Sequence, residues 1–145
     1  MGSFKKGFTL LELVIVLAII TISIGGILLS TRSSPRRELY LASRQLQADI
    51  RYTQRLALST GQRHEIVFEL RYNRYRIVQV SPRATLRTIY FRGSVQLISM
   101  TDTVLGFLPR GTSSRGFRIV LGNGDYGQHL TVTVSGGRVE IQEIQ

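Results

Sequence analysis

The 145-residue sequence contains no cysteine, which excludes a disulfide framework and a thiolate metal site. It has only two histidines, His64 and His129, and we expect both to be ordinary surface residues of strands. A nucleophile elbow, a phosphate-binding loop and an HExxH motif are all missing from the sequence. The sequence therefore predicts a protein that is not an enzyme and that has no cofactor and no metal site.

Acidic residues are scarce as well. Nine Asp and Glu stand against 19 Lys and Arg, and the formal net charge is +10. The positive charges are almost all arginines, with only two lysines, and guanidinium groups suit phosphates. A solvated face, or acidic neighbours in an assembly, accounts for such an excess equally well. The length fits one domain with a modest core.

One long apolar run, residues 8–29, precedes a mixed and Arg-rich remainder. As a helix it would be roughly 33 Å long, about one hydrocarbon thickness. A secretory signal peptide is one interpretation, but such an apolar region usually has about 7–15 residues, and no A-x-A-like site follows. A plain membrane anchor is another, and its orientation stays open because Lys5 and Lys6 precede the run while Arg32 and Arg36 follow it.

The stretch KKGFTLLELVIVLAII, residues 5–20, supports a third interpretation. It resembles the N-terminus of the type IV pilin and pseudopilin superfamily: a basic leader, a Gly, a Phe or Met, then an apolar helix with Glu as its fifth residue. The resemblance implies a leader of residues 1–7, cleavage between Gly7 and Phe8 by a prepilin peptidase, and N-methylation of the Phe8 amine by the same enzyme. It also implies a single-pass protein of the cytoplasmic membrane, with its soluble domain outside the cytoplasm, that is later assembled into a filament.

Glu12 is the fifth residue of that predicted mature chain. A charged residue in a membrane helix is costly, by roughly 2.5–3.5 kcal/mol at mid-depth. Glu12 would lie only about 6 Å along the helix from Phe8, where the helix dipole favours an anion. A carboxylate that reaches the headgroups, or one that is protonated in lipid, is the structural explanation. The functional explanation is a filament-assembly contact, in which Glu12 pairs with the Phe8 amine of a neighbouring subunit, as the family resemblance implies.

Helical periodicity continues after the apolar run. Small and apolar residues recur at spacings of three and four, namely Leu39, Ala42, Leu46, Ile50, Thr53 and Ala57. We therefore predict one long helix over residues 8–59, ended by Gly61. Its part over residues 8–30 would form the transmembrane and filament-core segment, and residues 31–145 the soluble pilin-like domain.

Gly25, Gly26 and Pro35 are weak points of this helix. Close helix packing and a simple kink explain them as ordinary features of a membrane helix. Filaments of the family that the N-terminus resembles unwind locally in their first helix, and this makes the three residues a candidate hinge.

From His64 onward the hydrophobic period switches to two, over residues 64–144. Residues 64–70 and 74–80 flank residues 71–73 as a hairpin, and six further short strands follow, with turns at residues 122–127 and 136–137. About eight strands behind one helix predict an α+β fold in which the helix packs on one or two antiparallel sheets. This is also the pilin-like fold that the resemblance implies.

The stretches ASRQLQADIRYTQRLALSTGQRHEIVF, LGFLPRGTSSRGFRIVL and GGRVEI resemble the H-type minor pseudopilins of type II secretion, a family that includes FimT-like minor pilins. The resemblance covers nearly the whole chain. It implies a structural subunit of a type II secretion filament, at or near the tip, that helps assembly for protein export. Its partners would be the prepilin peptidase and N-methyltransferase, other pseudopilins or pilins of a hetero-oligomeric filament, and the cytoplasmic membrane.

The alternative function is that of a FimT-like minor type IV pilin that binds DNA for uptake. Loss of the leader removes two lysines and leaves a net charge of 10 − 2 = +8, all of it from arginine. The candidate DNA contacts are Arg71, Arg74 and Arg76 with Tyr72 and Tyr75, and Arg110 with Arg115. No nucleic-acid-binding module is present, and Glu140 stands where a FimT-like DNA binder would be expected to have a second basic residue.

Overall fold

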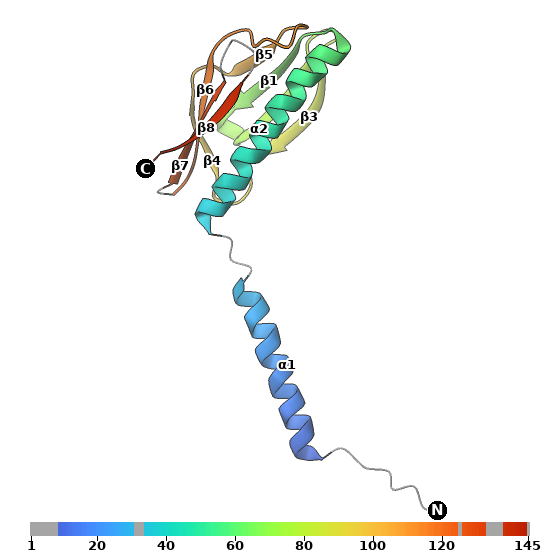
Figure 1. The fold of residues 1–145 in the computed structure, drawn as a ribbon, viewed down its shortest axis with the longest axis vertical. Helices are drawn as coiled ribbons and strands as arrows, with labels where there is room; N and C mark the ends of the chain where they lie inside the picture. Colours follow the sequence, from blue (N-terminus) through green and yellow to red (C-terminus); the bar gives the residue numbers. More distant parts are fainter. Residues whose placement is uncertain (1–8, 31–33, 125, 133–137, 145) are drawn as a thin grey trace, which may run out of the picture. The chain divides into compact units, whose positions relative to one another are not determined.

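The computed structural model describes the backbone of residues 9–30, 34–124, 126–132 and 138–144. The chain divides into two compact units, Met1–Ser33 and Ser34–Gln145. Within the described residues, the first unit holds one helix, and the second holds one long helix and eight strands (Figure 1).

The N-terminal unit contains the helix α1, which spans Leu10–Ser30 and begins directly after Thr9. The backbone N–H of Glu12 lies 3.0 Å from the Thr9 carbonyl oxygen and 3.3 Å from its hydroxyl oxygen, so Thr9 satisfies a donor that the first turn leaves free. The helical backbone runs through Gly25 and Gly26, whose role as a filament hinge stays a prediction. In the described part of the chain, no helix has the combination of length and hydropathy needed to cross a membrane.

The C-terminal unit begins with the helix α2, Pro35–Thr60. The structure differs here from the predicted single helix, because Ser34 is extended, with φ −65° and ψ 143°, and its hydroxyl oxygen accepts a hydrogen bond from the Arg37 N–H. A residue before proline is driven out of the helical region, and proline suits the first helical position, so Pro35 starts a helix rather than kinking one. Gly61 ends α2 at φ +63°, which confirms the predicted end.

In the residues that the structure describes, eight antiparallel strands form two four-stranded sheets, with the orders β3-β2-β1-β5 and β4-β6-β7-β8. The strands are β1 (His64–Glu69), β2 (Arg74–Gln79), β3 (Ala84–Tyr90), β4 (Gln96–Met100), β5 (Val104–Phe107), β6 (Phe117–Asn123), β7 (Tyr126–Val132) and β8 (Val139–Ile144). The predicted α+β architecture, its antiparallel pairing and the number of strands are confirmed.

The predicted hairpin between β1 and β2 is present, with Ile66 opposite Ile77. The short 3₁₀ turn Leu70–Tyr72 and Asn73, at φ +46°, connect its strands. The Asn73 side chain donates to the Val95 carbonyl at 2.8 Å and accepts from the Leu97 N–H at 2.9 Å. One turn residue therefore ties the first sheet to the edge strand of the second.

The connection between β6 and β7 is tighter than the turn predicted over residues 122–127. The strand β6 continues through Gly122 and Asn123, and Asn123 pairs with Tyr126. The Asn123 amide also donates to the Pro35 carbonyl at 3.0 Å, so this strand end is fixed to the start of α2. The turn predicted at residues 136–137 lies outside the described residues.

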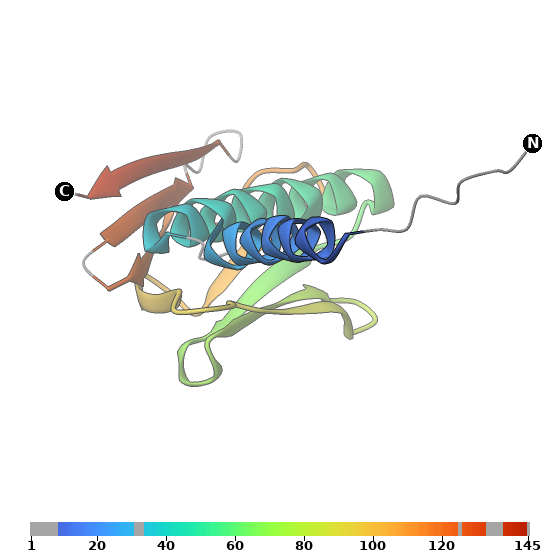
Figure 2. The same ribbon diagram turned by 90° about the horizontal axis from the view of Figure 1, so that it is seen from below.

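One face of α2 lies across both sheets, as Figure 2 shows, and contacts strands of each. The predicted stripe forms this contact: Leu39, Leu46, Ile50, Thr53 and Ala57 are buried, and Ala42 packs against the core at its edge. Phe68 of the first sheet stacks on Phe117 of the second with ring centroids 5.2 Å apart. Burying each large apolar side chain contributes about 1.5–3 kcal/mol, so this shared core holds the two sheets and the helix together.

Candidate functional site

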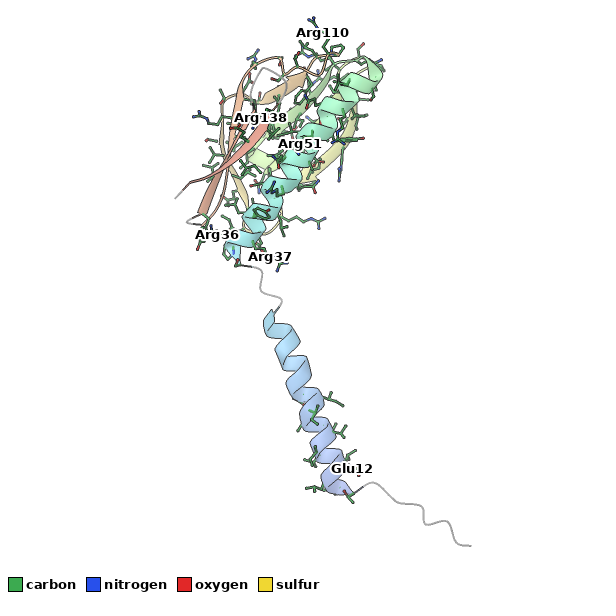
Figure 3. All side chains as sticks on the ribbon, viewed as in Figure 1. Glu12, Arg36, Arg37, Arg51, Arg110 and Arg138 are labelled. Carbon is green, nitrogen blue, oxygen red and sulfur yellow. The ribbon has the colours of Figure 1, made fainter. Side chains whose placement is uncertain are left out.

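The first candidate site is the N-terminal end of α1, where Figure 3 labels Glu12. Glu12 lies in the first helical turn, and its neighbours Leu10, Leu11, Leu13 and Val14 are all more than half exposed. Its carboxylate therefore projects from an apolar surface, at the helix end where the dipole favours a negative charge. The predicted processing residues, Gly7 and Phe8, lie outside the described residues.

The apolar surface continues along α1, where the large side chains between residues 15 and 20 are 43–59% exposed. A continuous exposed apolar surface of this kind marks contact with lipid or with protein. The segment Leu10–Ser30 contains no Lys, Arg or His. A cation that pairs with Glu12 must therefore come from outside this helix.

The second candidate site is the arginine cluster of the β1–β2 hairpin. Arg74 and Arg76 both form ion pairs with Glu69, at 2.5 Å in the case of Arg76. The guanidinium carbon of Arg74 also lies 4.8 Å from the Tyr72 ring centroid and 5.5 Å from that of Tyr90. The hydrogen bond from Arg74 is the main cause that lowers the pKa of Glu69, and its counterpart from Glu69 raises the pKa of Arg74.

The other residues predicted to contact DNA do not complete such a surface. Tyr75 is a core residue, 1% exposed, and this corrects its predicted place beside the hairpin arginines. Arg115 pairs with Asp102 at 2.7 Å. Arg71 and Arg110 are exposed, but the pairing of His64 with Phe107 puts them beyond opposite ends of β1. Three of the five predicted arginines are thus paired with two carboxylates within the chain, and the two clusters do not merge, which weakens the DNA alternative.

The two histidines do not form a site together. His64 lies on β1 of one sheet, and His129 lies on β7 of the other. His64 is 1% exposed, with its Nδ1 atom 3.1 Å from the Gln62 carbonyl oxygen, so its predicted surface position is wrong. Its inward direction follows from the register of β1, which buries His64, Ile66 and Phe68 on the same face. No group of three potential metal ligands occurs in the described residues.

Sequence reasoning missed a buried polar network under α2. Asp49 is 3% exposed, and its carboxylate accepts hydrogen bonds from the Tyr75 hydroxyl at 2.6 Å, from Gln45 at 3.0 Å and from Arg87 at 3.2 Å. Burial is the main cause that raises the pKa of Tyr75 strongly, and the hydrogen bond to the Asp49 carboxylate is the second cause. The sequence did contain a signal for this network: Asp49 follows Leu46 by three residues, and this spacing places an acid on the buried stripe of the helix.

A groove of about 500 Å³ lies beside this network, between the first half of α2 and β3. Leu41, Ala42, Ile89 and Phe91 form its apolar lining, and Arg87 belongs to both the groove and the network. The groove is large enough to take an apolar side chain, and its floor contains the buried Tyr75.

The fold together with the N-terminal segment defines a pilin-like protein. The sequence matches the model of the prokaryotic N-terminal methylation motif over residues 3–28, and that of type II transport protein GspH over residues 42–137. The chain belongs to the GspH family, as the resemblance predicted.

Similar proteins agree with this assignment. The competence protein ComGD of Bacillus subtilis (strain 168) is 30% identical over 140 residues, which cover 95% of this chain and 94% of ComGD. The minor pseudopilin EpsH from the type 2 secretion system of Vibrio cholerae has the same fold, with a TM-score of 0.63 at 13% identity over 73% of this chain and 97% of EpsH. The type IV minor pilin FimU of Pseudomonas aeruginosa gives a TM-score of 0.64 at 22% identity, over 76% of this chain and 95% of FimU.

Proposed function

We propose that this protein is a structural minor subunit of a pilus-like filament and is not an enzyme. The observation that carries the proposal is the combination of a prepilin-type N-terminus with a GspH-family domain on one chain. The exposed apolar surface of α1 adds physical support, because such a surface needs lipid or neighbouring helices to cover it.

We further propose that the filament belongs to a competence-type machine. The likeness to ComGD spans nearly the whole of both chains, and ComGD is a competence protein. The sequence interpretation favoured a type II secretion filament, and the GspH family name keeps that machine as the competing assignment. Deletion of the gene from its native host separates them: a competence role predicts loss of transformation with protein secretion intact, and a secretion role predicts the opposite result.

Assembly would proceed through the N-terminal site. The prepilin peptidase cuts between Gly7 and Phe8 and methylates the new amine, while residues 8–30 hold the precursor in the cytoplasmic membrane and the Ser34–Gln145 unit lies outside the cytoplasm. Cleavage creates a cation that the precursor lacks, four residues before Glu12. Pairing that amine with Glu12 of a neighbouring subunit removes two charges from a low-dielectric environment, where an attraction between opposite charges is strongest. A position at or near the filament tip suits a minor subunit.

Mass spectrometry of the protein purified from native membranes tests the processing step. The expected N-terminus is a methylated Phe8, and Gly7→Ala is expected to leave the leader attached. Ser3→Ala is the matched control, because it alters the leader without touching the predicted cleavage position. A mature chain that still begins with the leader, in cells that process their other prepilins, would contradict the proposal.

A further inference from the structure

The outward face of α2 carries a regular pattern that its packing on the sheets does not use. Seven exposed residues follow one another at alternating spacings of four and three, and we name them the outer seam: Arg37, Leu41, Arg44, Ala48, Arg51, Arg55 and Leu58. Alternating spacings of three and four are those of residues that face a second helix in coiled-coil packing. The outer seam lies opposite the stripe that packs on the sheets, and Figure 3 labels Arg37 and Arg51 on it.

Four of these seven residues are arginines, and no carboxylate of the described residues pairs with any of them. Arg44 instead donates to the Tyr40 hydroxyl at 3.1 Å and to Gln47 at 3.2 Å. Arg51 and Arg55 are one helical turn apart, a spacing at which like charges destabilise a helix. The two acids of α2 are engaged elsewhere, Glu38 with Asn123 and Asp49 with Tyr75.

The apolar members of the pattern indicate a protein partner. Leu41 and Leu58 are 55% and 54% exposed, although each is large enough to belong in a core. Tyr40 and Tyr52 flank the outer seam and are also nearly half exposed. Interleaved leucine and arginine fit a helix that supplies both apolar contacts and carboxylates, since arginine binds carboxylate groups with paired hydrogen bonds.

A second copy of this chain does not fit the outer seam through the same face. Facing outer seams would place arginine against arginine, and the acids of the Ser34–Gln145 unit whose side chains the structure describes are already bonded within their own chain. These acids are Glu38, Asp49, Glu65, Glu69, Asp102 and Glu140. Like charges brought together across an interface cost several kcal/mol, and this cost disfavours a contact between two copies of the outer seam.

We propose that the outer seam docks an acidic α-helix of a different filament subunit. This inference rests on the proposed function and adds the chemistry of the partner. Such docking would make the protein an obligate minor component, because the protein would join a filament beside acidic subunits and would not polymerise through this face alone. The groove next to Leu41 lies at the border of the same surface.

Site-specific crosslinking in the native host tests the partner directly. Because the protein has no cysteine, Ala48→Cys creates a single thiol at the centre of the outer seam. A photocrosslinker is attached to this thiol and activated by light, and the crosslinked peptides are mapped by mass spectrometry. The crosslink is expected to join residue 48 to an acidic helix of another pilin-like subunit. Ser99→Cys, on the exposed part of β4, is the matched control and is expected to miss that helix. A crosslink to a second copy, or to no filament subunit, would overturn the inference.

Charge reversal gives an independent measurement. Arg51→Glu/Arg55→Glu is expected to lower recovery of the protein in the sheared filament fraction by roughly tenfold, about the loss of a few exposed ion pairs. Arg83→Glu/Arg118→Glu makes the same change of charge at exposed positions outside α2 and is expected to leave recovery unchanged. Equal recovery of both variants refutes the docking surface alone, whereas absence of the parent protein from the filament refutes the proposed function itself.

The full-length protein in detergent micelles is then titrated with a short DNA duplex and with phosphatidylglycerol vesicles. We expect weak binding, reduced equally by Arg51→Glu/Arg55→Glu and by the control charge-reversal variant, because such binding reflects net charge only. Tight, salt-dependent binding to either probe that only Arg51→Glu/Arg55→Glu removes would assign the outer seam to nucleic acid or lipid and overturn the inference.

Discussion

Replacement of Asp49 by alanine tests the buried network that joins α2 to the first sheet. The Asp49 side chain is 4% exposed, whereas its ion-pair partner Arg87 is 55% exposed, so Arg87 can return to water at little cost. The Tyr75 hydroxyl cannot, because Tyr75 is 1% exposed and its acceptor at 2.6 Å is removed. An unsatisfied buried hydroxyl costs about 1–3 kcal/mol, and the lost ion pair adds about 0–1 kcal/mol. We therefore expect Asp49→Ala to lower the free energy of unfolding by about 1–4 kcal/mol.

The assay is urea unfolding of the Ser34–Gln145 unit, followed by far-ultraviolet circular dichroism and extrapolated linearly to water. Tyr75→Phe serves as the control, with an expected loss of about 1 kcal/mol, because Asp49 keeps its bonds to Gln45 and Arg87. The double variant is expected to lose less than the sum of the two, since it leaves no hydroxyl unsatisfied. A loss below about 0.5 kcal/mol for Asp49→Ala, or strict additivity, would refute this account of the network.

Two further predictions concern the same unit. Burial raises the pKa of Tyr75, so the folded state keeps a proton that the unfolded state releases above about pH 10. The free energy of unfolding should therefore be unchanged below that pH and fall above it. Urea titrations at several pH values should show a smaller fall for Tyr75→Phe. Asn73→Ala should destabilise the unit by about 2–3 kcal/mol in urea unfolding, because it removes two hydrogen bonds and places alanine at positive φ. Asn73→Gly, which removes the bonds but tolerates the backbone, should lose less, and an equal loss for both variants would show that the conformation of the turn contributes nothing.

The elements that local patterns specify were predictable from the sequence. The stripe from Leu39 to Ala57 has helical spacing, Gly61 is a helix terminator, and a period of two flanks the Asn73 turn. The Ser34–Pro35 pair is also a local signal for the start of a helix. The single helix predicted over residues 8–59 did not use this signal, because the helical periodicity continues on both sides of it. The N-terminal assembly site stays a prediction of a different kind, since a motif of fixed order names Gly7, Phe8 and Glu12 without reference to the fold.

Contacts between distant segments explain the rest. The burial of Tyr75 and its bond to Asp49 join residues that the fold alone brings together, and the burial of His64 depends on which face of β1 meets α2. The pairing of Arg74 with Glu69 is an intermediate case. The predicted hairpin, with residues 71–73 as its loop, would set Leu70 opposite Arg74, whereas the observed register sets Glu69 there, so this ion pair depends on a strand register that the sequence pattern did not specify.

In the proposed assembly, cleavage creates the amine that Glu12 pairs with in the filament, and a single variant tests this pairing. In the native host, Glu12→Ala is measured for leader removal by mass spectrometry and for recovery in the sheared filament fraction, beside Thr9→Ala, which alters the same helix start but keeps the carboxylate. Glu12→Ala is expected to show normal cleavage and membrane association but to be missing from the filament, whereas Thr9→Ala is expected to show normal recovery. Recovery of Glu12→Ala at the level of the parent protein would contradict the pairing.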